Sequence, residues 1–257
     1  MITHPFGHNY NRALIIFSLD IWQNKEVLKF LVASYSGFYT LILSFLAVQF
    51  IYRLLTLVNV SLARKFEGVG VLGWISYPVF CGGLYILLYY LFAEPDEYSV
   101  HYLKYEMLRV YDMDIENISH FSLIPYESDN TLRWNNLLFI LLGGCLLGIQ
   151  YFIIIFCGFQ MHFSINSELG HLSMPNKKLQ KQFFQALIAQ TLVPTFLFVF
   201  PAIPLLAGPV LDKEWSMETG IIVSLLSIYP PIDSLVFMVI VTEYKRIIRG
   251  EEMRRVE

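Results

Sequence analysis

Five long stretches that hold no charged residue, or only one, divide this chain. Each exceeds the roughly 20 residues that an α-helix needs to cross the hydrocarbon layer of a bilayer. Lipid cannot bond to free backbone N–H and C=O groups, and the stretches lack the alternation of a membrane β-strand, so each is expected to form a helix. The expected membrane-spanning helices are residues 30–52, 68–93, 134–157, 182–208 and 219–242.

The composition agrees with a chain that has lipid as its main solvent. Charged residues make up only 15% of the sequence and hydrophobic residues 56%, whereas about 25% of an ordinary soluble domain is charged. The predicted fold class is therefore all-α, a polytopic transmembrane helix bundle that forms a single domain over residues 1–257.

Basic residues in the connections predict the orientation of the bundle. Lys and Arg gather in the loops on the cytoplasmic side of a membrane protein. One set of connections holds most of them: Arg53, Arg64, Lys65, Lys177, Lys178, Lys181, Lys245, Arg246, Arg249, Arg254 and Arg255. The N-terminal segment 1–29 and the acidic loop 94–133 are thus expected outside the cell, and the tail 243–257 in the cytoplasm.

The two outer segments are expected to differ in character. Residues 1–29 contain an apolar stretch too short to span a membrane and no pattern of a signal peptide, so we expect a loop or a surface-lying segment. Loop 94–133 carries the triplet Asn117-Ile118-Ser119, which would face the glycosylating lumen during synthesis. Asn117 is therefore a candidate glycosylation site.

A carboxylate accompanied by two prolines marks the last expected span. Proline removes a backbone hydrogen bond in mid-helix, and an ionisable residue at membrane depth is costly, so Pro230, Pro231 and Asp233 indicate a helix that bends at a polar point. Asp233 lies in the half of its span near the cytoplasm, which favours a structural or conformational switch over ligand contact. The alternative is a neutral, protonated residue that bonds to a backbone carbonyl.

The sequence lacks the motifs of enzymes, metal sites and nucleic-acid-binding surfaces. It has no glycine-rich phosphate loop, no paired zinc-binding motif, no plausible catalytic set of Ser, His and Asp, and no basic face. No catalytic residue, metal, cofactor or nucleic-acid partner is therefore expected. A transporter would need paired halves or several polar residues at mid-membrane, and a channel would need a polar stripe along its pore; neither pattern is evident.

Three short motifs follow one another along the expected spans. They are Phe50-Ile51-Tyr52-Arg53, then Pro175-Asn176-Lys177-Lys178-Leu179-Gln180, and finally Pro231-Ile232-Asp233 with Tyr244-Lys245-Arg246. In order and spacing the chain resembles nematode seven-helix chemoreceptors of the str type, from about Pro5 to Arg249. The resemblance implies a G-protein-coupled receptor at the plasma membrane, on sensory neurons and their cilia. Such a receptor detects a small-molecule odorant or other chemical cue and signals to a heterotrimeric G protein.

The same resemblance assigns the five expected spans to helices three to seven of a seven-helix receptor. Helices one and two have no counterpart in this sequence, and residues 5–22 would correspond to the outer loop between the second and third helices. The alternatives are a truncated, non-signalling receptor remnant or another polytopic membrane protein such as a transporter.

The resemblance also implies a role for Tyr52 and Arg53, which end the first expected span. Many seven-helix receptors keep an arginine there that rearranges when a G protein docks, but the acidic residue that commonly precedes this arginine has no counterpart here. The alternative is an interfacial arginine that extends to the headgroups beside an aromatic ring. The candidate residues for G-protein coupling and switching are therefore Tyr52, Arg53, Pro230, Pro231 and Asp233.

Four residues in the outer half of the first expected span are candidates for ligand contact. Residues four apart share a helix face, so Ser34 pairs with Phe38, and Tyr35 pairs with Tyr39 on a neighbouring face. Aromatic walls with a few hydroxyl groups suit a small, weakly polar molecule. Helix packing is the alternative role for each residue, because aromatic side chains occur throughout the chain.

Overall fold

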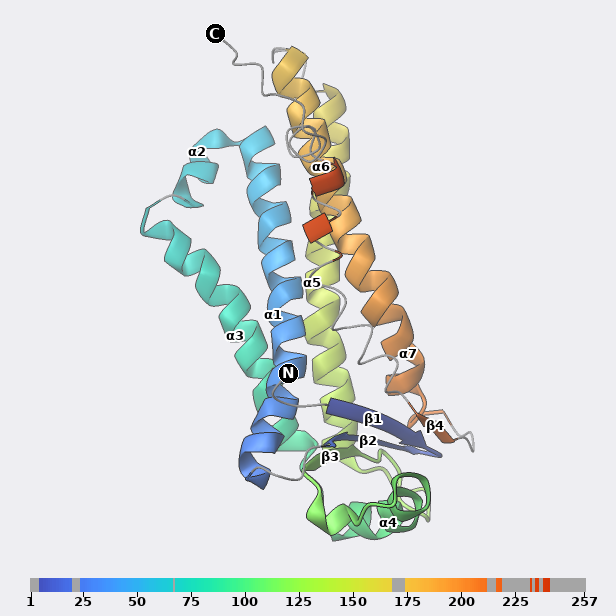
Figure 1. Cartoon of the computed structure of the whole chain (residues 1–257). Coiled ribbons are helices and arrows are strands. Elements are labelled where there is room, and N and C mark those ends of the chain that lie inside the picture. Colours follow the sequence, from blue (N-terminus) through green and yellow to red (C-terminus); the bar gives the residue numbers. More distant parts are fainter. Residues whose placement is uncertain are drawn as a thin grey trace.

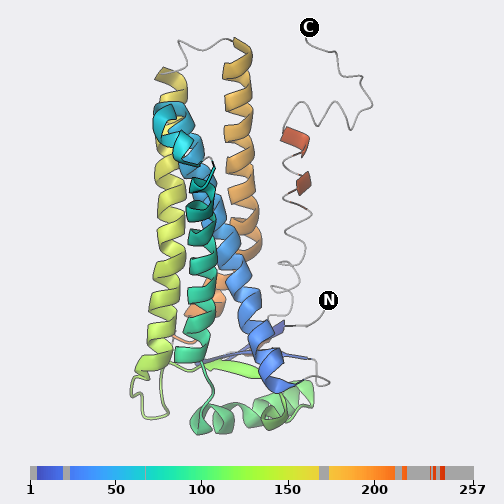
Figure 2. The ribbon, with the colours of Figure 1, turned by 90° about the vertical axis from the view of Figure 1, so that its left-hand side faces the viewer.

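The computed structural model describes residues 5–19, 24–66, 68–167, 174–211 and 216–218, together with single helical positions between 232 and 240. Its long helices run side by side, as Figure 1 and Figure 2 show. The helical elements are α1 (Lys25–Val58), α2 (Val60–Ala63), η1 (Arg64–Phe66), α3 (Gly70–Phe92), α4 (Glu97–Tyr111), η2 (Ile115–Asn117), α5 (Trp134–Ser167), α6 (Met174–Pro194), η4 (Thr195–Val199) and α7 (Phe200–Ala207). The strands are β1 (Pro5–Tyr10), β2 (Ala13–Ser18), β3 (His120–Leu123) and β4 (Ser216–Glu218).

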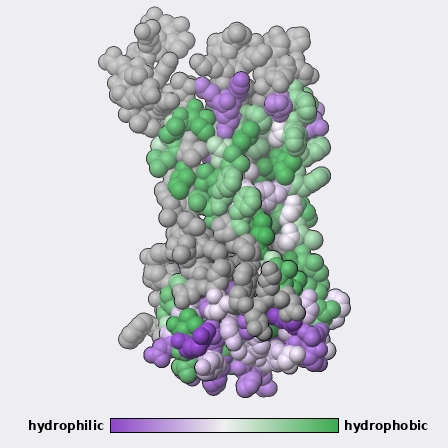
Figure 3. All heavy atoms as spheres, turned by 90° about the vertical axis from the view of Figure 1, so that its right-hand side faces the viewer, coloured by the Kyte–Doolittle hydropathy of each residue, from purple (hydrophilic) through white to green (hydrophobic). Residues whose placement is uncertain are grey.

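Among the described residues, three helices are long and apolar enough to cross a membrane: α1, α3 and the Trp134–Ser164 part of α5. The 34 residues of α1 extend about 50 Å at 1.5 Å per residue, more than the roughly 30 Å of the hydrocarbon layer. In Figure 3 an apolar band separates polar clusters at the two ends of the molecule. The charge-free stretches 30–52, 68–93 and 134–157 thus coincide with α1, α3 and α5. Both α1 and α5 extend beyond them, because a helix can continue through the polar interface.

The fourth expected span, 182–208, is built from three consecutive helical segments. A π-helical turn, η4, lies between α6, which ends at Pro194, and α7. In this turn the N–H of Phe200 donates to the carbonyl of Thr195, five residues earlier. Prolines flank the turn, and Pro201 has no N–H to continue the regular helical ladder. The proline-rich sequence therefore interrupts this helix near its middle.

The fifth expected span, 219–242, falls largely on residues outside the described part of the chain. It therefore remains a prediction, as does the assignment of the spans to helices three to seven.

A four-stranded antiparallel sheet covers one end of the bundle, where the sequence predicts no strand. Its order is β3-β2-β1-β4. β1 and β2 form a hairpin, β3 comes from the segment between α3 and α5, and β4 follows α7 (Figure 1). The hairpin turns at Asn11, whose φ of 51° lies in the left-handed region that Asn tolerates better than most residues. The all-α expectation is therefore wrong at this end, and so is the expectation of a loop or surface-lying segment for residues 5–18.

Both faces of the sheet are buried, which explains why its strands lack the alternation of polar and apolar residues by which strands are predicted. On β2, Leu14 packs toward the helix bundle, whereas Ile15 and Phe17 pack against α4 and its flanking residues. Side chains of a strand alternate between the two faces, so a strand buried on both faces is a continuous apolar run. The layers are the helix bundle, the sheet and then α4 (Figure 1).

The acidic segment between α3 and α5 is an ordered layer. α4 begins with a capping box, in which the Ser99 N–H donates to Asp96 Oδ1 at 3.0 Å and the Asp96 N–H donates to Ser99 Oγ at 2.9 Å. The segment is then fastened to the bundle by the buried amide of Asn136. Its Oδ1 accepts from the Ile124 N–H at 2.9 Å, and its Nδ2 donates to the Phe92 carbonyl at 2.8 Å.

α1 and α3 cross at two glycines that bring their backbones together. A Cβ atom on Gly82 would lie 2.9 Å from the backbone oxygen of Gly37, and one on Gly37 would lie 2.5 Å from Cγ1 of Ile86. Small residues allow membrane helices to approach this closely. α3 is joined to α5 by a hydrogen bond of 2.8 Å between Gln150 Nε2 and the Tyr77 hydroxyl. The three membrane-length helices therefore form one packed unit.

Candidate functional site

Tyr52 lies in the half of α1 remote from the sheet, where it is fixed by a column of aromatic rings. Its ring centroid is 5.1 Å from that of Phe66 in η1. Phe66 in turn stacks on Trp74 of α3, with centroids 4.0 Å apart and planes 7° from parallel. Tyr52 thereby holds this part of α1 against η1 and α3.

Arg53, the next residue, contacts α6 instead. Its Cζ atom lies 4.3 Å from the ring centroid of Phe183 and 6.0 Å from that of Tyr52. No carboxylate forms a salt bridge with Arg53 among the residues that the structure describes. A cation over an aromatic ring contributes about 0.5–2 kcal/mol, depending on how dry the site is. The guanidinium therefore joins α1 to α6 through an aromatic ring.

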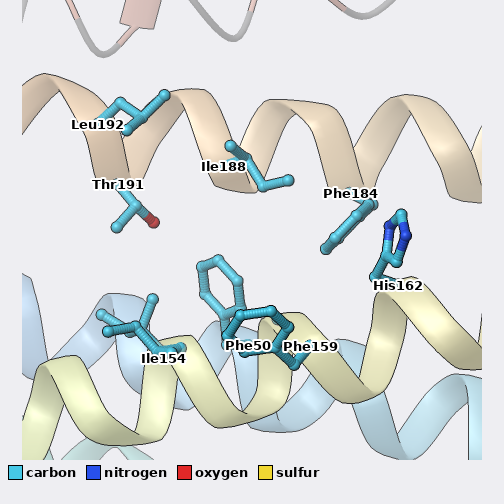
Figure 4. Close-up of a pocket in the computed structure, with 10 residues that line it drawn as sticks. Phe50, Ile154, Phe159, His162, Phe184, Ile188, Thr191 and Leu192 are labelled. Atoms are coloured by element: carbon cyan, nitrogen blue, oxygen red, sulfur yellow. The ribbon is translucent and has the colours of Figure 1, made fainter.

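A cavity of about 410 Å³ lies between α1, α5 and α6 in the same half of the bundle (Figure 4). Its walls are almost entirely apolar. Figure 4 shows Ile188 and Leu192 on α6 facing Phe50 and Ile154 across the space, with His162 at one end. The complete lining is Phe50, Ile154, Ile155, Gly158, Phe159, His162, Phe184, Ile188, Thr191 and Leu192. Because Phe50 precedes Arg53 by three residues, the cavity begins one helical turn from the guanidinium.

The four predicted ligand-contact residues lie in the half of α1 nearer the sheet. Their side chains differ in exposure and in the contacts that they make. Ser34 is 6% exposed, whereas Phe38 is 63% exposed, so these two side chains do not share one enclosed surface. The rings of Tyr35 and Tyr39 do lie together, with centroids 5.2 Å apart and planes at 67°. The tyrosine pair is therefore the part of the predicted set that the structure assembles.

Of the remaining predicted residues, only Asn117 lies in the part of the chain that the structure describes. Pro230, Pro231 and Asp233 lie outside the described residues, so their role in switching remains a prediction. Asn117 is exposed at the end of η2, in the layer that also contains α4. The hydroxyl of Ser119 donates to the Lys25 carbonyl at 2.9 Å, which places the triplet beside the start of α1.

Comparison with known proteins decides the family. The family described as the serpentine type 7TM GPCR chemoreceptor Str matches residues 1–249. The chain belongs to the Str family. It is therefore a multi-pass membrane protein of a receptor family, which confirms the resemblance drawn from the sequence motifs.

Relatives of this Str chain are found in Caenorhabditis elegans. "G-protein coupled receptor str-33" is 40% identical over 253 residues, which cover 95% of this chain and 73% of that protein. "Serpentine receptor class r-10" is 25% identical over 255 residues, or 96% of this chain and 74% of the relative. "G-protein coupled receptor str-217" is 26% identical over 219 residues, which cover 82% of this chain and 62% of the relative. No solved structure matches the chain.

In this Str-family chain a buried polar cluster, which sequence reasoning missed, joins the sheet to α4. Glu106 of α4 is 1% exposed and accepts hydrogen bonds from the Ser216 hydroxyl at 2.9 Å and from Arg109 Nη2 at 2.7 Å. His8 Nε2 lies 3.4 Å from the same carboxylate, and His8 Nδ1 lies 3.2 Å from the Tyr111 hydroxyl. β1, β4 and α4 therefore meet around one carboxylate.

The ionisation of Glu106 is set by this cluster. Burial alone would raise the pKa of Glu106, but hydrogen bonds from Ser216 and Arg109 and the positive charge of Arg109 outweigh burial and hold the pKa below its ordinary value. No sequence pattern could have found the cluster, because His8, Glu106 and Ser216 come from three segments that are far apart in the Str chain.

Proposed function

We propose that this Str-family chain is a chemosensory receptor that binds a small, weakly polar molecule and signals to a heterotrimeric G protein. The observation that carries the proposal is the 40% identity over 253 residues with a protein described as G-protein coupled receptor str-33. The contact between Arg53 and Phe183 supports it, because it links two helices at the end of the bundle where a G protein would dock.

We propose that the ligand contacts the half of α1 nearer the sheet. Tyr35 and Tyr39 offer two adjoining rings with hydroxyl groups. The buried hydroxyl of Ser34 has no hydrogen-bond partner in the described part of the chain, which leaves it free to bond to a ligand. The sequence groups Phe38 with these residues, but its exposure predicts the smallest contribution of the four.

The proposal is tested by G-protein activation in cells that carry the protein at matched surface levels. Once a panel of small odorants yields an agonist, the double variant Tyr35→Ala and Tyr39→Ala should raise its half-maximal concentration roughly tenfold, because two ring contacts of about 0.5–1.5 kcal/mol each are lost. Phe38→Ala is the matched control and should change it less than about twofold. An unchanged response of the double variant would remove the tyrosines from the ligand site.

We further propose that Tyr52, Arg53, Pro230, Pro231 and Asp233 form the switch of the receptor. Arg53 holds α1 to α6, and Tyr52 holds α1 to η1 and, through Phe66, to α3. A separation of α1 from these elements must therefore break the contacts of both residues. In the same assay, Asp233→Asn should weaken signalling at unchanged surface level. Normal signalling by that variant would exclude Asp233 from the switch.

We propose that the N-terminus is extracellular, that the C-terminus is cytoplasmic and that the receptor lies in the plasma membrane of sensory cilia. The exposure of Asn117 supports glycosylation of the end that carries the sheet. Digestion with a peptide N-glycosidase should shift the wild-type band on a gel but not the band of Asn117→Gln. Labelling of the tagged chain in sensory neurons checks the location, and an absent shift would contradict the proposed orientation.

A further inference from the structure

The cavity between α5 and α6 opens sideways, toward the surroundings of the bundle rather than only into its interior. Phe159 is 64% exposed and Leu192 is 47% exposed, yet both line the cavity. Both side chains are apolar, and lipid surrounds the apolar band of a membrane protein (Figure 3). A hydrocarbon chain can therefore enter the cavity from the bilayer without crossing water.

Three helices each carry a nitrogen-bearing side chain at, or one turn beyond, the end of this cavity remote from the sheet. His162 is part of the lining. Arg53 lies one turn beyond Phe50 on α1, and Lys181 lies one turn before Phe184 on α6, so each continues a cavity-lining row of its helix. Lys181 is exposed, and Arg53 is half-buried.

Among the residues that the structure describes, this cationic end has no compensating acidic side chain. Neither Asp nor Glu occurs in the cavity lining. Within the part of the chain that the structure describes, no carboxylate pairs with Arg53 or with Lys181. An apolar cavity that ends in unpaired positive charge complements a molecule with a hydrocarbon tail and an anionic head.

We propose that this cavity binds one acyl chain of an anionic phospholipid from the adjacent membrane leaflet, with the phosphate at Arg53 and Lys181. The acyl chain lies between Phe50 of α1, Phe159 of α5 and Ile188 of α6. His162 donates a hydrogen bond to the headgroup. The site lies in the opposite half of α1 from the proposed odorant contacts, and it does not depend on whether the chain signals.

Gly158 provides a substitution that fills the cavity without disturbing the helix contacts. A Cβ atom there would meet Phe50 Cε1 at 3.5 Å, an ordinary van der Waals distance, so Gly158→Leu can extend its side chain into the space. Gly148 lies on the same helix, and a Cβ atom there has nothing within 4 Å. Gly148→Leu is therefore the matched control.

The test uses the purified full chain in nanodiscs of phosphatidylcholine with or without phosphatidylserine. Native mass spectrometry counts the lipid that stays bound, and a phosphatidylserine with a photoreactive acyl chain marks the site. We expect wild type and Gly148→Leu to retain phosphatidylserine and to be labelled on α5 and α6, and Gly158→Leu to lose both signals. Lys181→Gln, an exposed change that leaves the cavity intact, should lower the preference for phosphatidylserine over phosphatidylcholine roughly fivefold.

Three results would overturn the proposal. Equal retention of the two lipids by wild type excludes an anionic headgroup site. Undiminished labelling in both Gly158→Leu and Lys181→Gln excludes the cavity. If Gly158→Leu keeps its lipid but loses G-protein nucleotide exchange, the cavity belongs to a protein-docking surface instead.

Discussion

Gly82→Val is expected to lower the thermal unfolding temperature of the purified protein sharply, or to prevent recovery of folded protein altogether. The new Cβ would lie 2.9 Å from the backbone oxygen of Gly37 and 3.1 Å from Cβ of Leu41. A backbone oxygen cannot rotate away as a flexible side chain can, so α1 and α3 would have to move apart. Overpacking of a core costs about 1–3 kcal/mol, and a shift of whole helices places this change at the upper end.

The neighbouring glycine supplies the control for this substitution. A Cβ atom on Gly83 has nothing within 4 Å, so Gly83→Val should leave the unfolding temperature close to that of wild type. Both variants place the same β-branched residue in α3, and helix propensity therefore cancels in the comparison. Thermal unfolding in detergent, followed by size-exclusion chromatography, measures the difference. Equal stability of the two variants would show that the glycine crossing does not hold α1 and α3 together.

Glu106→Gln is expected to loosen the layer formed by the sheet and α4, with a loss on the order of 2 kcal/mol for hydrogen bonds to a buried charged group. The variant keeps the shape of the side chain but removes the charge that Ser216, His8 and Arg109 share. Arg109 is 53% exposed, so solvent screens its part of the interaction. Most of the loss should therefore come from the buried contacts with β1 and β4.

The effect of Glu106→Gln should depend on pH in a defined direction. The pKa of Glu106 is lower in the folded protein than its ordinary value, so the unfolded chain binds the proton more readily. The carboxylate consequently stabilises the fold above the ordinary glutamate pKa of about 4.3, and this contribution is lost as the pH falls through the lower folded value. The unfolding temperatures of wild type and variant should differ at neutral pH and converge in acid.

Glu97→Gln serves as the control because Glu97 is an exposed residue in the first turn of the same helix. It should change the unfolding temperature little at any pH. A gap between wild type and Glu106→Gln that stays constant into acid would contradict the assigned role of the carboxylate.

The long helices could be predicted from the sequence because one physical rule dominates them. A charge inside hydrocarbon is so costly that the charge-free intervals around α1, α3 and α5 coincide with membrane-length helices. The sheet follows no such rule. Ala13–Ser18 is apolar on both faces, and β4, one of the two partners of β1, comes from residues far along the chain. The one local feature of the sequence that is compatible with the hairpin is the residue type at its turn, because Asn tolerates the left-handed conformation that Asn11 adopts.

The candidate site likewise has features that the sequence predicts and features that depend on contacts between distant segments. The sequence predicts that Arg53 ends a span without an acidic neighbour, but not that its partner is Phe183 on a distant helix. Helix periodicity groups Ser34 with Phe38, although the first is buried and the second exposed. Periodicity determines which residues lie on the same face of a helix. The neighbouring helices determine which side chains on that face are buried.

The sheet also constrains how the protein is made. β1 is synthesised well before its partner β4, because His8 and Ser216 are 208 positions apart in the sequence. One edge of the hairpin must therefore remain unpaired while the helices enter the membrane, and an unpaired edge strand is prone to associate with other chains. The final strand closes this edge only after α7 has been synthesised. The sheet of this receptor-family protein is thus completed only after α1, α3, α5, α6 and α7 have been synthesised.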